Sequence, residues 1–194
     1  DAQESRGLGD VYKRQVLYHE TMEGLRINPE GIYVDCTFGG GGHSRGILEQ
    51  LNENGKLFAF DQDADAQRNI SNDERVVFVP QNFRHLQRFL RLHKVTAVDG
   101  VLADLGVSSH QFDEGDRGFS TRFAGPLDMR MDRRQQVSAA DIIRTYTEQR
   151  LHKLFEQYGE VSNAKTLARQ IVQQRNHLHV ATIEQFKSLI APVV

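Results

Sequence analysis

The sequence has little of several residue types, and each shortage excludes a class of protein. Among its 194 residues are one cysteine, Cys36, no tryptophan and four prolines. A lone cysteine can form neither an intramolecular disulfide nor a cysteine metal cluster, which favours a reducing, cytoplasmic setting. No apolar run approaches the roughly 20 residues that cross a bilayer, so we expect no transmembrane helix and no membrane partner. What remains, 39% hydrophobic and 26% charged residues, is typical of a globular chain.

The sequence also lacks an excess of positive charge. Lysine and arginine number 24 against 26 aspartates and glutamates, which gives a formal net charge of -2. Bulk charge therefore does not indicate a nucleic-acid partner, and any such site must be a local basic patch. The sequence does not indicate an oligomeric state.

Both ends of the chain are unusual. Residues 1–15, "DAQESRGLGDVYKRQ", begin without methionine and show no period, so we expect a non-native or disordered leader there. The chain stops at "IAPVV", an apolar run without a terminating signal. We expect the natural protein to continue beyond this point.

The first half alternates between strand-like and helix-like segments. Short β-branched and aromatic runs predict strands at 32–38, 56–61 and 75–80, and residues 98–109 predict a fourth strand that runs into a polar loop. Apolar residues at helical spacing predict helices at 43–51, 63–70 and 82–93. This alternation predicts an α/β fold with a doubly wound parallel sheet.

The character of the chain changes after Ser109. Residues 110–136 read as a long loop rich in glycine, aspartate and arginine. Helical periodicity then follows, with Ser138 and Ser162 as expected N-caps, over 138–146, 148–158, 162–175 and 182–190. We therefore expect a core domain over residues 16–136 and a helical domain over 137–194.

Four glycines join the first strand to the first helix, at positions 39–42. Glycine lets a backbone approach a ligand closely, and a helix N-terminus offers free N–H groups. The dinucleotide fingerprint G-x-G-x-x-G nevertheless fails, because Ser44 stands where the third glycine belongs. The glycines thus predict a nucleotide-like cofactor, and a tight turn without a ligand is the alternative.

Two acidic residues follow later strands at the same predicted edge. Asp61 lies about twenty residues past the glycines, where an acid usually binds ribose hydroxyls. It could instead cap the next helix, although Asp63 can fill that role and leave Asp61 free. Asp104 ends the fourth strand in "ADLGVSS", where a methyltransferase would hold the cofactor and the amine, or where it could simply cap the loop. We find no proton-transfer pair for a dehydrogenase.

Several long motifs resemble one family. "VDCTFGGGGHSRGIL", "FAFDQD", "VDGVLADLGVSSHQFD", "RGFS" and "GPLDMRMD" closely resemble the RsmH (MraW) family of S-adenosylmethionine-dependent methyltransferases. The resemblance runs from Val16 to the end. It implies methylation of N4 of a decoding-centre cytosine in bacterial 16S rRNA within the small ribosomal subunit. It also implies a Rossmann-like class I sheet with an inserted helical domain, of which the later strands are expected to be missing here.

The resemblance also implies the residues of the site. Its cofactor contacts fall on the glycine loop, the ribose-binding acid, a residue beside the adenine, the strand-four acid and one further position: Gly39, Gly41, Gly42, His43, Asp61, Phe83, Asp104 and Gln111. Phe83 also fits the apolar face of its helix. Asp104 is the candidate acceptor that orients the amine, and Ser108 and Ser109 are weaker substrate contacts. No metal and no covalent nucleophile are required.

The loop over residues 110–136 is the candidate RNA contact. It carries five arginines, at Arg117, Arg122, Arg130, Arg133 and Arg134. Arginines bind phosphates, and Phe119 and Phe123 could stack on an unstacked base. The alternatives are a solvated turn for the arginines and packing for the aromatic rings.

Three other functions stay open. The chain could be a non-catalytic RNA-binding or ribosome-assembly module, or an NAD-type oxidoreductase. Methylation of a DNA amine is disfavoured, and no DNA partner is expected, because "DLGVSS" stands in place of the aromatic loop usual after strand four.

Overall fold

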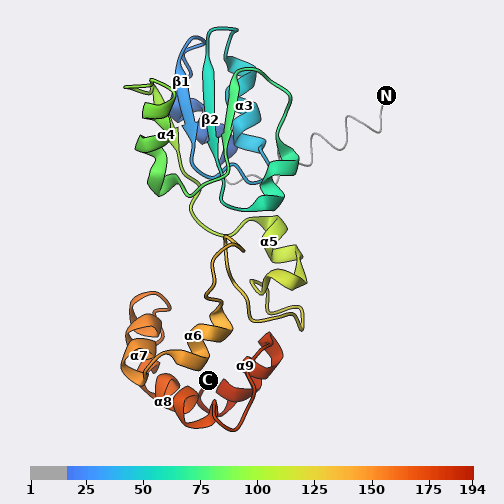
Figure 1. Ribbon diagram of the computed structural model, residues 1–194, viewed down its shortest axis with the longest axis vertical. Coiled ribbons are helices and arrows are strands. Elements are labelled where there is room, and N and C mark those ends of the chain that lie inside the picture. Colours follow the sequence, from blue (N-terminus) through green and yellow to red (C-terminus); the bar gives the residue numbers. More distant parts are fainter. Residues whose placement is uncertain (1–16) are drawn as a thin grey trace, which may run out of the picture. The chain divides into compact units, whose positions relative to one another are not determined.

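A computed structural model of the protein describes residues 17–194 (Figure 1). The expected leader at residues 1–15 lies outside the described residues. The chain divides into two compact units, of which the first ends at Gly106 and the second spans Val107–Val194. Each unit is described by itself.

The first unit is built on a parallel sheet. Its strands are β1 (Ile32–Asp35), β2 (Lys56–Phe60), β3 (Val76–Val79) and β4 (Gly100–Leu102). Their order is β3-β2-β1-β4, and all neighbours are parallel. The predicted α/β class is confirmed. The fourth strand ends at Leu102 and runs into a loop that contains Asp104, as predicted.

Helices cover both faces of this sheet (Figure 1). They are α2 (Tyr18–Leu25), α3 (Gly42–Gln50), the 3-10 helix η1 (Ala64–Asn69), the 3-10 helix η2 (Phe83–His85) and α4 (Leu86–Leu92). Two segments predicted as helices are thus 3-10 helices entirely or in their first turn. Asp63 caps η1 and Asn82 caps η2 through side-chain oxygens, so local capping defines where both begin.

Strand alternation gives each face its own apolar core. Tyr33 and Leu57 face one side, with Ile47 of α3 and Leu25 of α2. The next residue along each strand, Val34 or Phe58, faces the other side, where α4 packs through Leu86, Phe89 and Leu90. Successive strand residues point to opposite faces, so a four-residue strand can serve both cores.

The second unit is helical. It contains α5 (Ser109–Asp113), η3 (Gly115–Arg117), α6 (Ala139–Thr145), α7 (Glu148–Gln157), α8 (Ala164–Gln174), α9 (Ile183–Ile190) and η4 (Ala191–Val193). Ser138 caps α6 in a capping box, as predicted. The prediction for Ser162 is wrong: α8 begins later, with Asn163 at the N-cap position.

Residues 107–136 group with these helices, whereas the sequence places a boundary after 136. Leu127 is buried in the helical core and donates its N–H to the Ala181 carbonyl at 2.8 Å. Ala140 in turn donates to the Leu127 carbonyl at 2.8 Å. The start of the predicted loop is also helical, at α5 and η3. The polar composition of the loop does not indicate these long-range contacts.

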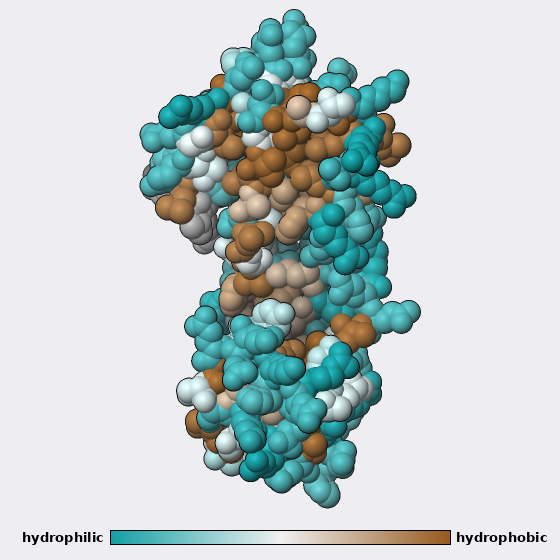
Figure 2. Space-filling view, turned by 90° about the vertical axis from the view of Figure 1, so that its left-hand side faces the viewer, coloured by the Kyte–Doolittle hydropathy of each residue, from teal (hydrophilic) through white to brown (hydrophobic). Residues whose placement is uncertain are grey.

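One edge of the sheet leaves apolar surface exposed. Within residues 17–194, β4 pairs with β1 alone, and the Val101 side chain is 48% exposed. Figure 2 shows apolar side chains gathered on the unit that contains this strand. No helix in the described part of the chain is both long and apolar enough to cross a membrane.

Candidate cofactor site at the carboxyl edge of the sheet

The glycine loop leaves β1 and enters α3 through backbone conformations that favour glycine. Gly41 is the N-cap of α3, with φ 74°, and Gly39 has φ 51°. A Cβ on Gly41 would lie 2.9 Å from the Phe38 ring. Only glycine fits this position without strain. The loop therefore brings bare backbone and the N-terminus of a nine-residue helix to the edge where parallel sheets bind ligands.

Asp61 holds this loop in place. One carboxylate oxygen accepts the Gly39 N–H at 2.7 Å, and the other accepts the Asp63 N–H at 2.8 Å. Asp63 caps η1, as predicted, but the expectation that Asp61 is thereby left free is wrong. Each carboxylate oxygen has a second lone pair, so both can still accept a ligand hydroxyl. Burial raises the pKa of Asp61, and the backbone hydrogen bonds oppose that shift.

Further hydrogen bonds tie the other strand ends to the same edge. The Asp104 N–H donates to the Thr37 hydroxyl at 2.8 Å, which links the loops after β4 and β1. The Asn82 amide donates to Gln62 Oε1 at 2.9 Å, which links the loops after β3 and β2. Together with the Asp61–Gly39 bond, these contacts hold the loops after all four strands in one arrangement.

A buried carboxylate beneath the loop was missed by sequence reasoning. Asp35 ends β1 and is 1% exposed. It accepts hydrogen bonds from the Ser44 hydroxyl at 2.7 Å and from the Thr37 N–H at 3.0 Å. Burial raises its pKa, whereas the bond from Ser44 acts in the opposite direction. An acid between an apolar strand and a glycine run was the available signal, because a charge there needs donors from both neighbouring segments.

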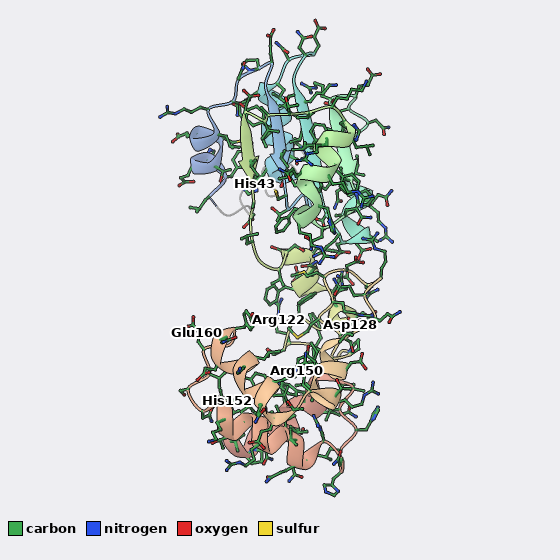
Figure 3. All side chains as sticks on the ribbon, turned by 60° about the vertical axis from the view of Figure 1, so that its left-hand side comes forward. His43, Arg122, Asp128, Arg150, His152 and Glu160 are labelled. Carbon is green, nitrogen blue, oxygen red and sulfur yellow. The ribbon has the colours of Figure 1, made fainter. Side chains whose placement is uncertain are left out.

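His43 carries a polar atom without a partner. The ring lies in the first turn of α3, is 6% exposed, and stacks on Tyr18 with ring centroids 5.9 Å apart. Its Nε2 is buried and has no hydrogen-bond partner in the described part of the chain. Figure 3 shows His43 at the end of the sheet where the strands finish. Buried polar atoms are normally paired, so this nitrogen fits a ligand that supplies the missing partner.

Phe83 and Cys36 differ in their exposure to solvent. Phe83, the first residue of η2, is 37% exposed and is not part of the apolar cluster beneath α4. The core alternative for this ring therefore does not hold, and part of the ring is accessible to a ligand. Cys36 is buried, and burial raises the pKa of its thiol to about 11. It is protonated at neutral pH, which fits the interpretation that it is not catalytic.

Asp104 is exposed in the loop after β4. Its backbone N–H, and not its carboxylate, makes the bond to Thr37. Within residues 17–194 the carboxylate has no protein partner. An acceptor at this edge is thus available to a substrate or cofactor.

The other predicted site residues of this region belong to the second unit. Ser108 and Gln111 form the capping box of α5: the Ser108 hydroxyl accepts the Gln111 N–H at 3.2 Å, and Gln111 Oε1 accepts the Ser108 N–H at 3.0 Å. Both therefore have a structural role. Ser109 is the exposed first residue of that helix.

The predicted RNA-contact arginines are engaged within their own loop. Arg117 is 2% exposed and donates to the Arg130 carbonyl at 3.1 Å, so its burial does not fit direct contact with phosphate. Arg122 pairs with Asp113 at 3.0 Å (Figure 3 labels Arg122). Arg133 donates to the Asp116 carbonyl at 3.3 Å.

The remaining two arginines form ion pairs with aspartates two residues earlier. Arg130 contacts both carboxylate oxygens of Asp128, at 2.6 and 2.7 Å. Arg134 contacts those of Asp132 at 2.8 and 3.0 Å. The arginine side chain holds the pKa of each aspartate below its usual range. The acids thus neutralise much of the loop's positive charge.

A cavity of about 730 Å³ lies elsewhere in the first unit. Its lining includes Asn52, Lys56 and Arg75, which come before or at the start of β2 and β3. That is the amino edge of the sheet, opposite the glycine loop. Because ligands of parallel α/β sheets bind at the carboxyl edge, we do not assign the cofactor to this cavity.

The chain matches one family over nearly all of its length. The profile of the MraW methylase family matches residues 10–194. Proteins named "Ribosomal RNA small subunit methyltransferase H" are 54% identical over 183 residues in Bacteroides thetaiotaomicron and 56% identical over 167 residues in Cytophaga hutchinsonii. The matches cover 94% and 85% of this chain, but 60% and 56% of the relatives. The chain thus spans about three fifths of the length of these curated relatives.

A solved structure from Clostridium thermocellum named "putative rRNA-methylase" is 18% identical, with a TM-score of 0.36 over 39% of this chain and 47% of that one. This likeness is too low to carry an argument. The family profile, which matches almost the whole chain, is decisive: the chain belongs to the MraW methylase family.

Proposed function

We propose that this chain is the cofactor-binding part of an S-adenosylmethionine-dependent methyltransferase of the small ribosomal subunit, acting in the cytoplasm on N4 of a decoding-centre cytosine in 16S rRNA. The observation that carries the proposal is the hydrogen bond between Asp61 and Gly39 in the loop that leads to His43, whose buried Nε2 has no partner within residues 17–194. Family membership supports the reaction class. The identity of the nucleotide rests on the resemblance of the motifs.

The residues at the carboxyl edge fit the cofactor. Asp61 has lone pairs for ribose hydroxyls, Phe83 offers a partly exposed ring for adenine, and the backbone of Gly42, the first residue of α3, suits the anionic methionine end. The Gly41 N–H already donates to the Phe38 carbonyl at 2.8 Å, so the proposed contribution of Gly41 is its lack of a side chain. A bound ligand would also give His43 Nε2 its missing partner. S-adenosylmethionine, when bound, supplies an electrophilic methyl group. Gln111 is a further proposed contact, in addition to its capping role.

Asp104 is the residue that we assign to the amine. The lone pair of a cytosine amino group is delocalised into the ring, so the group is a weak nucleophile. A carboxylate that accepts a hydrogen bond from the amino N–H orients the nitrogen and stabilises the positive charge that develops there. The Asp104 backbone is fixed by Thr37 while its carboxylate stays exposed, as this role requires. Ser108 and Ser109 are secondary candidates for substrate contact.

The second unit is proposed to contribute to substrate recognition. Arg122, Arg130, Arg133 and Arg134 can contact RNA if phosphates replace their present partners, and this exchange weakens each contact. Arg117 supports the loop from within.

A thermal-shift experiment tests the cofactor site. S-adenosylhomocysteine should raise the melting temperature and NAD should not, because a ligand stabilises only the state that binds it. Asp61→Ala should abolish the shift. The matched control is Asp73→Ala, which removes a hydrogen-bonded carboxylate from the opposite edge of the same sheet. Stabilisation by NAD, or a full shift in Asp61→Ala, would contradict the proposal.

A second assay tests the reaction. The chain, and a version extended to the length of its relatives, would be incubated with small ribosomal subunits and S-adenosylmethionine carrying a labelled methyl group. Label should appear on N4 of one cytosine, and Asp104→Asn should reduce the rate more than it changes the S-adenosylhomocysteine shift. Label on another base, or none with the extended chain, would refute the proposed substrate.

A further inference from the structure

Helix α4 and the preceding turn η2 carry a row of basic side chains that the site does not use. Arg84, Arg88 and Arg91 are spaced four and three residues apart, and Lys94 follows the helix. All four side chains are exposed. We call this set the α4 basic stripe.

The stripe lies on the face of the helix opposite the core. Leu86, Phe89 and Leu90 pack against the sheet. Helical spacing of 3.6 residues per turn places Arg88 and Arg91 on the other side. The amphipathic pattern therefore fixes the stripe outward, on a helix anchored to the sheet by its apolar face.

No acidic residue neutralises this row locally. Residues 76–98 contain no aspartate or glutamate, although the whole chain has more acidic than basic residues. Arg84 donates to the ring of its neighbour His85 at 2.9 Å. Within the described part of the chain, none of the four stripe residues forms an ion pair. The arginines of the loop over residues 110–136 differ, because most of them already form ion pairs with aspartates.

We propose that the α4 basic stripe binds the phosphate backbone of RNA. This inference rests on the proposed function, since an rRNA substrate brings a phosphate backbone to the protein. Arginine forks match phosphate oxygens, and unpaired arginines lose no existing ion pair when they bind. Seven residues of helix give the stripe a length of about 10 Å, enough to follow a backbone and not only one phosphate.

Two other anionic partners fit less well. An interfacial helix inserts its apolar face into a membrane, but the apolar face of α4 is buried against the sheet. Stable protein interfaces have an apolar or aromatic centre, whereas the exposed apolar residues here, Phe83 and Leu92, lie at the two ends of the segment. Gln87 lies among the arginines between them. Phosphate contacts need only exposed cations, which the stripe provides.

The test compares two triple variants of the full 194-residue chain. Arg84→Gln/Arg88→Gln/Arg91→Gln removes the stripe. The matched control, Arg68→Gln/Arg144→Gln/Arg169→Gln, removes the same charge from three exposed arginines that are each paired with an acid. Glutamine is close to arginine in helix propensity, so both variants should fold, and the melting temperature checks this.

Binding of a short fluorescein-labelled RNA hairpin is measured by anisotropy over a range of salt concentrations. Each lost phosphate contact lowers the slope of log K against log salt by about 0.7–0.9. The stripe variant should therefore lose about 2–3 in slope and about 50-fold or more in affinity near physiological salt. The control should stay within a few-fold of the unaltered chain.

The inference is overturned if both variants bind alike, or if the unaltered chain shows no salt-dependent RNA binding. It is also overturned if phosphatidylglycerol vesicles or polyglutamate compete for the stripe more strongly than RNA. The thermal shift with S-adenosylhomocysteine and the methyl-transfer assay separate this inference from the proposed function. If both triple variants bind RNA alike while the thermal shift and the methyl transfer are as expected, only the stripe proposal is refuted. If the stripe variant alone loses RNA binding while S-adenosylhomocysteine gives no thermal shift, only the proposed function is refuted.

Discussion

Ser44→Ala removes one hydroxyl from a carboxylate that the fold has buried almost completely. The Ser44 hydroxyl donates to Asp35 at 2.7 Å, and both residues are 1% exposed. A hydrogen bond to a charged group contributes about 1.5–3 kcal/mol, and water cannot readily replace it at a buried site. Alanine favours the first turn of α3 by about 0.3–0.5 kcal/mol more than serine does. The net loss of unfolding free energy should be about 1–2.5 kcal/mol.

Urea unfolding followed by circular dichroism measures this loss. With a slope of about 2 kcal/mol per molar urea, the midpoint should fall by about 0.5–1.2 M. Ser120→Ala is the control, because its buried hydroxyl contacts Arg122 and no carboxylate. A double-mutant cycle with Asp35→Asn then isolates the pair, and a coupling above about 0.5 kcal/mol is expected.

The pH dependence gives an independent check on the same pair. Burial raises the pKa of Asp35 in the folded state above its unfolded value. The folded state therefore holds the proton more tightly, and the free energy of unfolding falls as pH rises from about 4 through the folded pKa. Asp35→Asn should lack this fall, and Ser44→Ala should extend it to higher pH, because the lost bond from Ser44 opposes the rise in pKa. A cost for Ser44→Ala below 0.5 kcal/mol, or the same cost in the Asp35→Asn background, would refute the reasoning.

Three further predictions concern the loop, the thiol and the sheet edge. Gly41→Ala should cost about 1–3 kcal/mol and weaken S-adenosylhomocysteine binding, because φ is positive and Phe38 blocks the new Cβ. Gly40→Ala, with open space around its Cβ, should stay within about 0.5 kcal/mol in urea unfolding. Cys36 should resist iodoacetamide at pH 7 in the folded chain and react after unfolding, as mass spectrometry would show; fast reaction of the folded chain contradicts its burial. Val101→Lys should raise the solubility of the chain, because it places a charge on the exposed edge strand, where unpaired strands promote aggregation. The fraction of protein left in solution after centrifugation measures this, and an unchanged fraction would contradict the prediction.

Much of the first unit is predictable because its signals are local. Apolar alternation and helical spacing are enough to place β1, β2, β3 and α4, and the capping role of Asp63 depends on a residue two positions away. The ion pairs of Arg130 and Arg134 are also local, each with an aspartate two residues earlier. Those spacings by themselves indicate ion pairs, which argue against free arginines that contact RNA.

The α4 basic stripe also follows from local sequence. Residues 76–98 contain no aspartate or glutamate, and their arginines recur at helical spacing. The periodicity that buries Leu86 and Phe89 also forces Arg88 outward. A charge pattern needs to be counted per segment, because the net charge of -2 hides it.

Sequence by itself determined the element types, the glycine turn and the chemical kinds of residue at the carboxyl edge, since these depend on neighbours within a few positions. Tertiary structure alone decided which groups meet there. Asp61 accepts from Gly39 across 22 residues, and Asp104 donates to Thr37 across 67. It also placed Leu127 against Ala181, and with it residues 107–136 among the helices. Such pairings depend on the order of strands and the packing of helices. These bring together groups far apart in the chain, and the sequence around one group does not indicate its partner.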